Sequence, residues 1–393
     1  MKVLTLALLL VASASASPLA RNRLERRTSL VVTTADITAF SLYAEYAGAA
    51  YCNSKATVGT VMSCANDVCQ TATANGAVIV ATLGSAAPDS ETDMEGYVAY
   101  DPAAHAVIIA YRGSNSIRNY IVDMDTLPAP CSTYLSAALA TEIEKDKGSQ
   151  NCLLHRGFGR AWASLRDETF AALTAAQAAA ATSANGTASS APGPAAVIVT
   201  GHSLGGAVAT LAAAELRAKG IACDLYSYGS PRVGNAVLAN YLSAQGPVGT
   251  TSANGLAHYR VTHLDDPVPQ LPPLWMDFAH TSPEFWLADG GTTTTGTGGS
   301  IVYQPANVNV CVGFANTSCN AGAPSVDIVA HLSYFEPISG CAPFKISFKS
   351  KKRVADGAGL YDENDATDRV AKMLLMDEPA RRNDMKVARR SQH

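Results

Sequence analysis

The segment Gly-His-Ser-Leu-Gly at residues 201–205 places the strongest constraint on what this 393-residue chain can fold into. A run rich in β-branched residues precedes it at residues 197–200, and a helix-forming run follows at residues 206–219. A strand, a tight turn and a helix with serine at the apex form the pattern of a nucleophile elbow, in which a strained turn exposes the serine hydroxyl. The flanking glycines are expected because a Cβ there would collide with neighbouring backbone. We therefore take Ser203 as the candidate nucleophile rather than part of a chance match.

Apolar stretches elsewhere in the chain indicate an α/β fold. Strands are expected at residues 106–111, 196–200, 224–228 and 257–262. Helices are expected at residues 36–51, 204–219 and 235–244. Near-continuous apolar strands that alternate with helices predict a mostly parallel sheet covered by helices on both faces. The sequence therefore predicts one α/β domain.

Two low-complexity stretches interrupt this pattern. Residues 171–196 are rich in Ala, Ser and Gly, and residues 289–300 consist almost entirely of Gly and Thr. Because their composition is so biased, we expect both to be surface insertions rather than linkers between domains.

The two ends of the chain differ in composition from the middle. Residues 1–17 carry a basic residue, a short apolar run and a small-residue cleavage signal, which predict a secretory signal peptide. Residues 18–27 end in two arginines and are expected to be a pro-segment, with an unstructured N-terminus as the alternative. Residues 28–348 would form the folded domain. The charged residues 349–393 are expected to be a disordered or cleaved tail, with an amphipathic helix around residues 368–376 as the alternative.

The expected domain is acidic. Residues 28–348 contain 13 Lys and Arg against 24 Asp and Glu, a net charge of −11, whereas the whole chain carries −4. An acidic domain argues against nucleic acid and anionic lipid surfaces as partners. Neutral or zwitterionic lipid, or a small molecule, remains as the expected substrate.

The nine cysteines fit an oxidising compartment, as expected of a secreted, extracellular protein. Proximity in the sequence suggests two small loops, closed by Cys64 with Cys69 and by Cys311 with Cys319. Cys223 begins an apolar strand and is expected to be a buried free thiol. Three pairings remain open for the other four, which are Cys52, Cys131, Cys152 and Cys341.

Two Asn-x-Ser/Thr sequons, at Asn185 and Asn316, agree with secretion and are candidate glycosylation sites.

A serine nucleophile requires a histidine base and usually a carboxylate that orients it. On this kind of fold the acid follows the serine in the chain and the histidine follows the acid, each on a loop after a later strand. Asp265 and Asp266 both follow the strand expected at residues 257–262. The residues alone do not separate these two carboxylates.

His331 is the candidate base. Of the other histidines after the acid, His280 comes too soon for a further strand to intervene, and His393 ends the chain. His155 and His202 precede the acid and are expected to have structural roles.

An acyl-transfer site also needs donors for the tetrahedral oxyanion. The backbone N–H of Leu204 supplies one, because it directly follows the nucleophile. The second is expected from Ser114, in the turn after the strand at residues 106–111. This chemistry requires no metal or cofactor.

Seven motifs occur in a specific order across residues 36–341. They are Ala49-Ala50-Tyr51-Cys52, the run from Tyr111-Arg112-Gly113-Ser114 to Ile121, Gly201-His202-Ser203-Leu204-Gly205-Gly206, the run from Tyr228-Gly229-Ser230-Pro231 to Gly234, residues 262–273, residues 280–287, and Ala330-His331-Leu332. Together they resemble the fungal class 3 lipases, secreted triacylglycerol lipases of filamentous fungi.

The resemblance implies an α/β-hydrolase fold, with a central mostly parallel sheet flanked by helices and a short helical lid. It implies Ser203, Asp266 and His331 as the catalytic triad, because the family's acid directly precedes an x-Val-Pro turn. Ser114 and Leu204 match its oxyanion hole. The disulfides that it implies are Cys52–Cys341, Cys64–Cys69 and Cys131–Cys152, while Cys311–Cys319 rests on proximity alone.

The residues that align with the family's lid are Ile117, Arg118, Asn119, Tyr120 and Ile121. Ile117, Tyr120 and Ile121 would form an apolar face that opening presents to a lipid surface. Tyr120 stands where the family commonly carries Trp. This departure argues against strong interfacial activation and against a preference for triacylglycerols over partial glycerides.

The resemblance therefore implies a secreted, monomeric lipase that hydrolyses acylglycerol esters at a lipid–water interface through an acyl-enzyme. Two alternatives are an esterase of soluble or aromatic (feruloyl-type) esters and a catalytically silent lipid-binding protein. The apolar lid argues against the esterase, because an enzyme that acts on soluble esters does not need a lid that binds a lipid surface. The intact set of candidate catalytic residues argues against the second.

Overall fold

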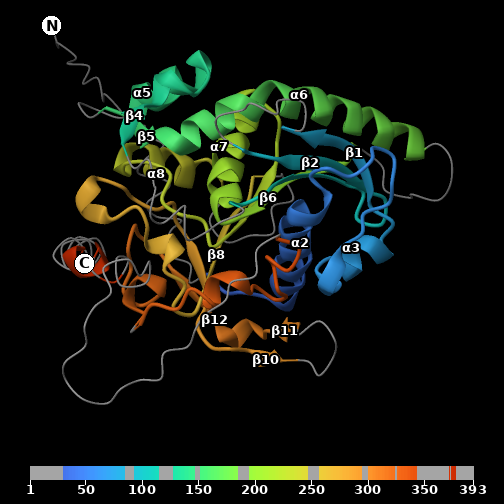
Figure 1. Cartoon of the computed structure of the whole chain (residues 1–393). Coiled ribbons are helices and arrows are strands. Elements are labelled where there is room, and N and C mark those ends of the chain that lie inside the picture. Colours follow the sequence, from blue (N-terminus) through green and yellow to red (C-terminus); the bar gives the residue numbers. More distant parts are fainter. Residues whose placement is uncertain are drawn as a thin grey trace, which may run out of the picture. The chain divides into compact units, whose positions relative to one another are not determined.

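An eight-stranded sheet forms the centre of the computed structural model, with strand order β1-β2-β3-β6-β7-β8-β9-β12 (Figure 1). Its strands are β1 (Val78–Leu83), β2 (Gly96–Asp101), β3 (Ala106–Tyr111), β6 (Ala196–His202), β7 (Asp224–Tyr228), β8 (His258–His263), β9 (Glu284–Leu287) and β12 (Val308–Cys311). The pairs from β3 to β9 are parallel, whereas β1, β2 and β12 add antiparallel edges. The predicted mostly parallel sheet is confirmed.

The structure describes residues 30–84, 93–114, 127–146, 151–184, 194–246, 256–293, 300–323, 325–342, 371 and 373–377. Nearly all of them belong to one compact unit, Val32–His393. The expected signal peptide, the pro-segment, the lid residues Ile117 to Ile121, the Asn185 sequon and most of the tail lie outside the described residues.

Helices cover both faces of the sheet (Figure 1). They are α2 (Thr34–Asn53), α3 (Gln70–Ala74), α5 (Ala137–Asp146), α6 (Arg156–Ala184), α7 (Leu204–Ala218) and α8 (Ala236–Ala244). Two small two-stranded sheets pair β4 (Pro128–Pro130) with β5 (Leu153–His155) and β10 (Thr292–Thr293) with β11 (Ile301–Val302). None of the helices in the described ranges is both long and apolar enough to cross a membrane.

Alternating side chains of the central strands build two separate cores. In β3, Val107 and Ile109 face α6 and α7, whereas Ile108 faces α2 on the other side. All six residues of β3 are buried, because a parallel strand between two helical layers has no face in water. This explains why the central strands could be found as apolar runs.

One expectation about the low-complexity stretches differs from the structure. Residues 171–184 are not a surface insertion but the second half of α6, and Leu173, Ala176 and Ala180 in it are buried. Alanine has the highest helix propensity of all residues, so an alanine-rich stretch next to a helix extends it.

Four disulfides are present: Cys52–Cys341, Cys64–Cys69, Cys131–Cys152 and Cys311–Cys319. The structure thus brings together the two pairs that proximity suggested and the two further pairs that the resemblance implied. Cys223 is a buried free cysteine.

Part of the C-terminal tail contacts the domain. Leu374 packs in a small apolar cluster with Val268 and Leu271. Asp377 is fully buried, lies 3.5 Å from Arg232 Nη1, and accepts a hydrogen bond from the backbone N–H of Trp275 at 3.1 Å. These contacts tie residues 373–377 to the chain that follows β8.

The Cys52–Cys341 bridge should stabilise the fold more than the Cys64–Cys69 bridge, because it closes a loop of 289 residues rather than 5. In the chain-entropy model, removing the long-range bridge costs about 5–6 kcal/mol and removing the short one about 2 kcal/mol. We expect the Cys52→Ser/Cys341→Ser variant to melt at a lower temperature than Cys64→Ser/Cys69→Ser, measured by differential scanning calorimetry. Equal melting temperatures would contradict this ranking.

Candidate active site

Ser203 occupies the turn between β6 and α7 in a strained conformation. Its φ is +58° and its ψ is −131°, a region that residues with a Cβ rarely adopt. A Cβ on Gly201 would lie 2.3 Å from Gly205 O, and one on Gly205 would lie 2.1 Å from Tyr111 O. The turn therefore needs both flanking glycines, and the strain persists because the surrounding sheet and helix fix it.

Asp266 and His331 form a fully buried hydrogen-bonded pair. His331 Nδ1 lies 2.8 Å from Asp266 Oδ2, and neither side chain is exposed to solvent. The carboxylate receives two further hydrogen bonds, from the Tyr334 hydroxyl at 2.5 Å and from the Val268 backbone N–H at 2.9 Å. Asp265, in contrast, is partly exposed and accepts a hydrogen bond from Ser325 Oγ. Of the two adjacent carboxylates, the structure brings Asp266 to the histidine.

The order of the strands brings these groups together. Ser203 follows β6, Gly229 follows β7 and Asp266 follows β8, so all three leave the same edge of a parallel sheet. The Ser203 backbone N–H donates to Tyr228 O at 2.9 Å, across to the end of β7. A Cβ on Gly229 would lie 2.9 Å from both His331 Nδ1 and Asp266 Oδ2. Glycine at this position lets the pair approach the backbone.

Two atoms remain without partners in this site. Ser203 Oγ and His331 Nε2 are both buried, and neither has a hydrogen-bond partner among the residues that the structure describes. His331 donates its Nδ1–H to Asp266, which leaves Nε2 as the basic nitrogen of a neutral imidazole. A basic nitrogen and an unpaired hydroxyl in one buried site are the groups that nucleophilic catalysis by serine requires.

The turn at Ser114 lies against the nucleophile. A Cβ on Gly113, the residue before it, would lie 3.1 Å from Ser203 Cβ and 2.8 Å from His202 O. Leu204 is the first residue of α7, where backbone N–H groups have no partner within the helix. The residue before Ser114 thus lies against the turn that carries Ser203, and Leu204 directly follows Ser203.

An ion cluster anchors the Ser114 turn through Arg112, two residues before Ser114. Arg112 Nη1 lies 2.6 Å from Glu95 Oε2, and Lys55 Nζ lies 2.9 Å from Glu95 Oε1. Burial raises the pKa of Glu95, but hydrogen bonds from Lys55 and Ser54 and the charge of Arg112 outweigh it, so that pKa lies below its ordinary value. Glu95 therefore stays ionised and holds Arg112 in place.

Two neutral histidines hold the backbone around His331. His202 Nε2 lies 2.8 Å from His331 O, and His263 Nδ1 lies 2.9 Å from Ala330 O. A carbonyl can only accept, so each imidazole donates there and keeps its other nitrogen as an acceptor. Those acceptors face the hydroxyls of Tyr51, 2.9 Å from His202 Nδ1, and of Tyr303, 2.9 Å from His263 Nε2.

Burial keeps both of these histidines uncharged. It lowers the pKa of His202 well below its ordinary value, with a further contribution from the neighbouring His331. Burial also lowers the pKa of His263, although its hydrogen bond to Ala330 O and the charge of Asp266 act in the opposite direction. The expected structural role of His202 matches these contacts. His155 stacks on Phe158 with ring centroids 3.8 Å apart, which is also a packing role.

Among the described residues, the sulfur atoms of Cys52, Cys64 and Cys341 form the one close group of possible metal ligands. All three belong to disulfides, so none offers a thiolate to a metal. The Asn316 sequon lies in the loop closed by Cys311–Cys319, and the Asn316 amide donates to Val312 O at 3.1 Å. Glycosylation there stays a prediction.

Sequence reasoning missed several residues that support the site. Tyr334 lies three residues after His331, and Tyr51 lies on the apolar face of the helix expected at residues 36–51, but the sequence predicts no role at the site for either. The sequence likewise gives no sign of Asn320, whose amide donates to Asp266 O at 2.9 Å. A tyrosine or asparagine that donates a hydrogen bond to the loop of the acid has no local sequence pattern, because its partner is distant in the chain.

Comparisons with known proteins find a matching family and similar sequences. The family described as Lipase (class 3) matches residues 108–276. The chain is 37% identical over 344 residues to secreted mono- and diacylglycerol lipase 1 of Fusarium solani, covering 86% of this chain and 89% of that protein. It is 34% identical over 311 residues to secreted mono- and diacylglycerol lipase A of Penicillium camembertii, covering 77% and 86%.

A solved structure is also similar to this chain. The crystal structure of mono- and diacylglycerol lipase from Aspergillus oryzae matches with a TM-score of 0.61 at 30% identity. The match covers 79% of this chain and 99% of that chain.

Replacing Asp266 should affect activity far more than replacing its neighbour. Asp266→Asn removes the charge that orients His331 and stabilises its protonated form, so we expect an esterase rate about 10⁴-fold lower. Asp265→Asn should leave the rate close to that of the unmodified protein, because its side chain does not contact His331. Both rates can be measured with a soluble p-nitrophenyl ester. The assignment of Asp266 would be wrong if the two variants lost activity equally.

Acid should destabilise the protein partly through His202. Its pKa is lowered in the folded state, so below the unfolded value of about 6.5 the unfolded chain binds a proton that the folded chain does not. The contribution of His202 is present above pH 6.5 and is lost, by up to about 1.4 kcal/mol per pH unit, as the pH falls below it. We expect His202→Gln, whose amide can still donate to His331 O, to show a shallower fall in unfolding free energy between pH 6.5 and 4.5. Parallel curves from urea titrations of the two proteins would contradict this.

Proposed function

The chain belongs to the class 3 lipase family, and from this premise we propose that it hydrolyses acylglycerol esters through Ser203, Asp266 and His331. As a lipase it is a carboxylic-ester hydrolase. The observation that carries the assignment of residues is the buried Asp266–His331 pair. In the same site, neither Ser203 Oγ nor His331 Nε2 has a hydrogen-bond partner within the described part of the chain.

The proposed reaction begins with proton transfer. His331 Nε2 takes the Ser203 proton as the hydroxyl oxygen attacks the ester carbonyl carbon, and Asp266 stabilises the imidazolium that forms. The backbone N–H of Leu204 and the N–H or hydroxyl of Ser114 donate to the tetrahedral oxyanion. His331 then returns the proton to the departing alcohol oxygen, which leaves an acyl group on Ser203.

Water completes the cycle by the same route. His331 Nε2 removes a proton from the water as its oxygen attacks the acyl carbonyl, and the same donors stabilise the second oxyanion. The proton returns to Ser203 Oγ as the fatty acid leaves. None of these steps calls for a metal or cofactor.

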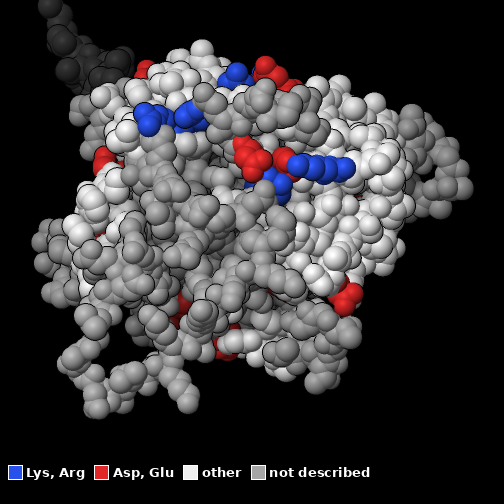
Figure 2. Space-filling view, in the orientation of Figure 1, with Lys and Arg blue, Asp and Glu red and all other residues white. Residues whose placement is uncertain are grey.

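Mono- and diacylglycerols are the proposed preferred substrates. The relatives of Fusarium solani and Penicillium camembertii are both named secreted mono- and diacylglycerol lipases. Tyr120, in the segment that resembles a lid, differs from the common Trp of the family and agrees with this choice. On the face in Figure 2, the described charged side chains include both signs.

We further propose that the mature protein acts outside the cell as a monomer that contacts the lipid surface. The relatives are named secreted lipases, and eight of the nine cysteines form disulfides, which persist in oxidising compartments. In this proposal residues 1–17 are a signal peptide, residues 18–27 a pro-segment and residues 28–348 the lipase domain. Residues 349–393 are a C-terminal tail, of which residues 373–377 contact the domain.

A substrate panel tests the function. We expect strong release of fatty acid from emulsions of monoolein and diolein, weaker release from triolein, and loss of all of it in Ser203→Ala, measured by titration of the acid. The panel should be run on the full chain and on a chain that ends at Phe348, so that any effect of the tail is seen.

The alternative functions predict different results. Slow turnover of emulsions with rapid hydrolysis of soluble p-nitrophenyl or feruloyl esters would favour an esterase. No Ser203-dependent hydrolysis of any ester would favour a silent lipid-binding protein. Faster turnover of triolein than of diolein would contradict the preference for partial glycerides.

A further inference from the structure

The turn that carries Asp266 is strained. Leu264, the first residue after β8, has φ of +39°, a left-handed conformation that is unfavourable for a side chain with a Cβ. Such a conformation persists only where its surroundings over-determine it. Two N–H groups donate hydrogen bonds to the Leu264 carbonyl: the indole Nε1 of Trp286 at 3.0 Å and the amide Nδ2 of Asn320 at 3.1 Å.

A single amide group bridges both ends of this turn. Asn320 Nδ2 donates to Leu264 O and, at 2.9 Å, to Asp266 O, so it uses both of its hydrogens on the turn. Asn320 is 2% exposed, so water does not compete for these bonds. The amide thereby ties the strained residue to the residue whose carboxylate lies 2.8 Å from His331.

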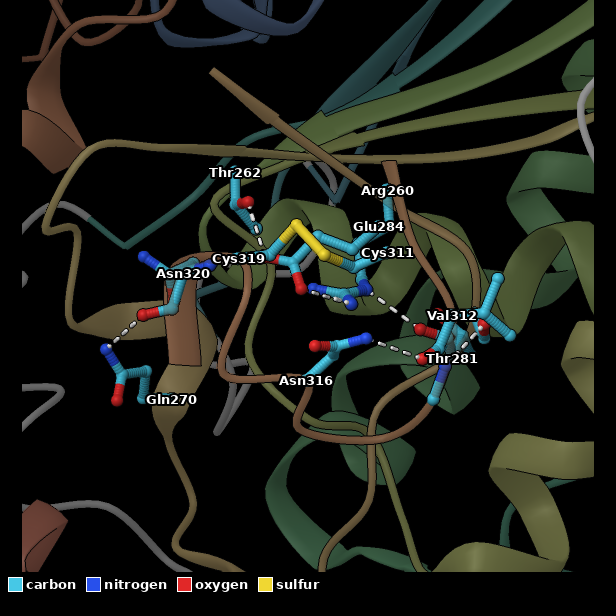
Figure 3. A network of polar contacts seen from close by, with 12 residues as sticks. Arg260, Thr262, Gln270, Thr281, Glu284, Cys311, Val312, Asn316, Cys319 and Asn320 are labelled. Atoms are coloured by element: carbon cyan, nitrogen blue, oxygen red, sulfur yellow. Dashed lines mark hydrogen bonds and ion pairs between the residues drawn. A yellow bond between two sulfur atoms is a disulfide. The ribbon is translucent and has the colours of Figure 1, made fainter. Parts of the chain in front are cut away.

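Asn320 is itself rigidly held (Figure 3). Its backbone N–H donates to Glu284 Oε1 at 3.3 Å, and its carbonyl accepts from Gln270 Nε2 at 3.0 Å. The buried Glu284 is fixed in turn by Thr262 Oγ1 at 2.6 Å and by Arg260 Nη2 at 3.1 Å. Both of these donors lie on β8, the strand that leads into the turn.

A disulfide anchors the other side. Cys319 directly precedes Asn320 and is bonded to Cys311, the last residue of β12 (Figure 3). Cys311 pairs with Glu284 across the antiparallel β9–β12 edge. The bridge therefore fixes Asn320 to the same sheet edge that holds Glu284.

We propose that Asn320 is a positioning residue that sets the location of the Asp266 carboxylate relative to His331, and that the Cys311–Cys319 disulfide supports it in this role. The inference rests on the proposed function, because it assumes that Asp266 is the triad acid. Without the amide, the turn at Leu264 can relax and carry Asp266 away from the imidazole. A displacement of about 1 Å in a catalytic group can lower a rate about 100-fold.

Asn53 provides a matched control. Its side-chain amide is also buried and also bridges two backbone carbonyls, Ala49 O at 3.1 Å and Ser63 O at 3.0 Å. Neither carbonyl belongs to the loops that carry Ser203, Asp266 or His331. Asn53→Leu therefore loses the same kind of hydrogen bonds as Asn320→Leu, without the link to Asp266, and leucine adds no charge in either place.

The experiment compares kcat, KM and the pH profile of a soluble ester for these two variants and the unmodified protein. For Asn320→Leu we expect kcat to fall about 10- to 100-fold with little change in KM. The acid limb of kcat/KM should move to lower pH, because a more distant Asp266 carboxylate favours protonated His331 less. Asn53→Leu should lower thermal stability but keep the kcat and the acid limb of the unmodified protein.

The Cys311→Ser/Cys319→Ser variant provides a second measurement if Asn320→Leu fails to fold. It keeps the amide but releases its anchor, so we expect a smaller loss of kcat with a shift of the acid limb in the same direction. An unchanged kcat and acid limb in the variant that folds, as in Asn53→Leu, would overturn the positioning role.

Failure of this proposal can be told from failure of the proposed function. Hydrolysis that depends on Ser203 but not on Asn320 overturns the positioning role alone. Hydrolysis that survives Ser203→Ala overturns the proposed triad and the positioning role with it.

Discussion

The site depends on the buried hydrogen bond between His331 Nδ1 and Asp266 Oδ2. Both side chains are fully shielded from water, so the protein alone must fix their distance and the tautomer of the imidazole. Hydrogen bonds to the backbone of both residues fix this distance. His202 and His263 donate to the carbonyls of His331 and Ala330, and Asn320 donates to the carbonyl of Asp266. In the proposed reaction this bond decides whether His331 Nε2 can take the serine proton.

The parallel sheet is what makes this bond possible. The loops that follow β6, β7 and β8 all start at the same edge of the sheet. Residues far apart in the chain therefore lie close together there. The strain at Ser203 and at Leu264, with φ of +58° and +39°, lies at the first residue after two of these strands. Such strained backbone conformations persist because rigid elements on either side of the loop hold them in place. The buried ion pair of Arg260 with Glu284 belongs to this support, because it ties β8 to β9.

Much of the arrangement could be predicted from the sequence, and the exceptions have physical reasons. Buried parallel strands such as β3 and β7 are apolar runs, and the predicted bounds of both match. The elbow at Ser203 has a local signature in its glycines, whereas the choice between Asp265 and Asp266 depends on which side chain faces the histidine. The prediction of an insertion at residues 171–184 is wrong, because the alanines of this half of α6 form no clear apolar stripe. Tyr334 and Asn320 act on distant loops, which periodicity cannot reveal.

Covalent labelling tests the central claim, that Ser203 is a nucleophile activated by His331, most directly. A fluorophosphonate should add one group per molecule, and peptide mass spectrometry should place it on Ser203. The rate of labelling should fall sharply when His331 is replaced by Gln, since the hydroxyl is then not activated. No adduct in the unmodified protein, an adduct on another residue, or labelling that is independent of His331 would contradict the account.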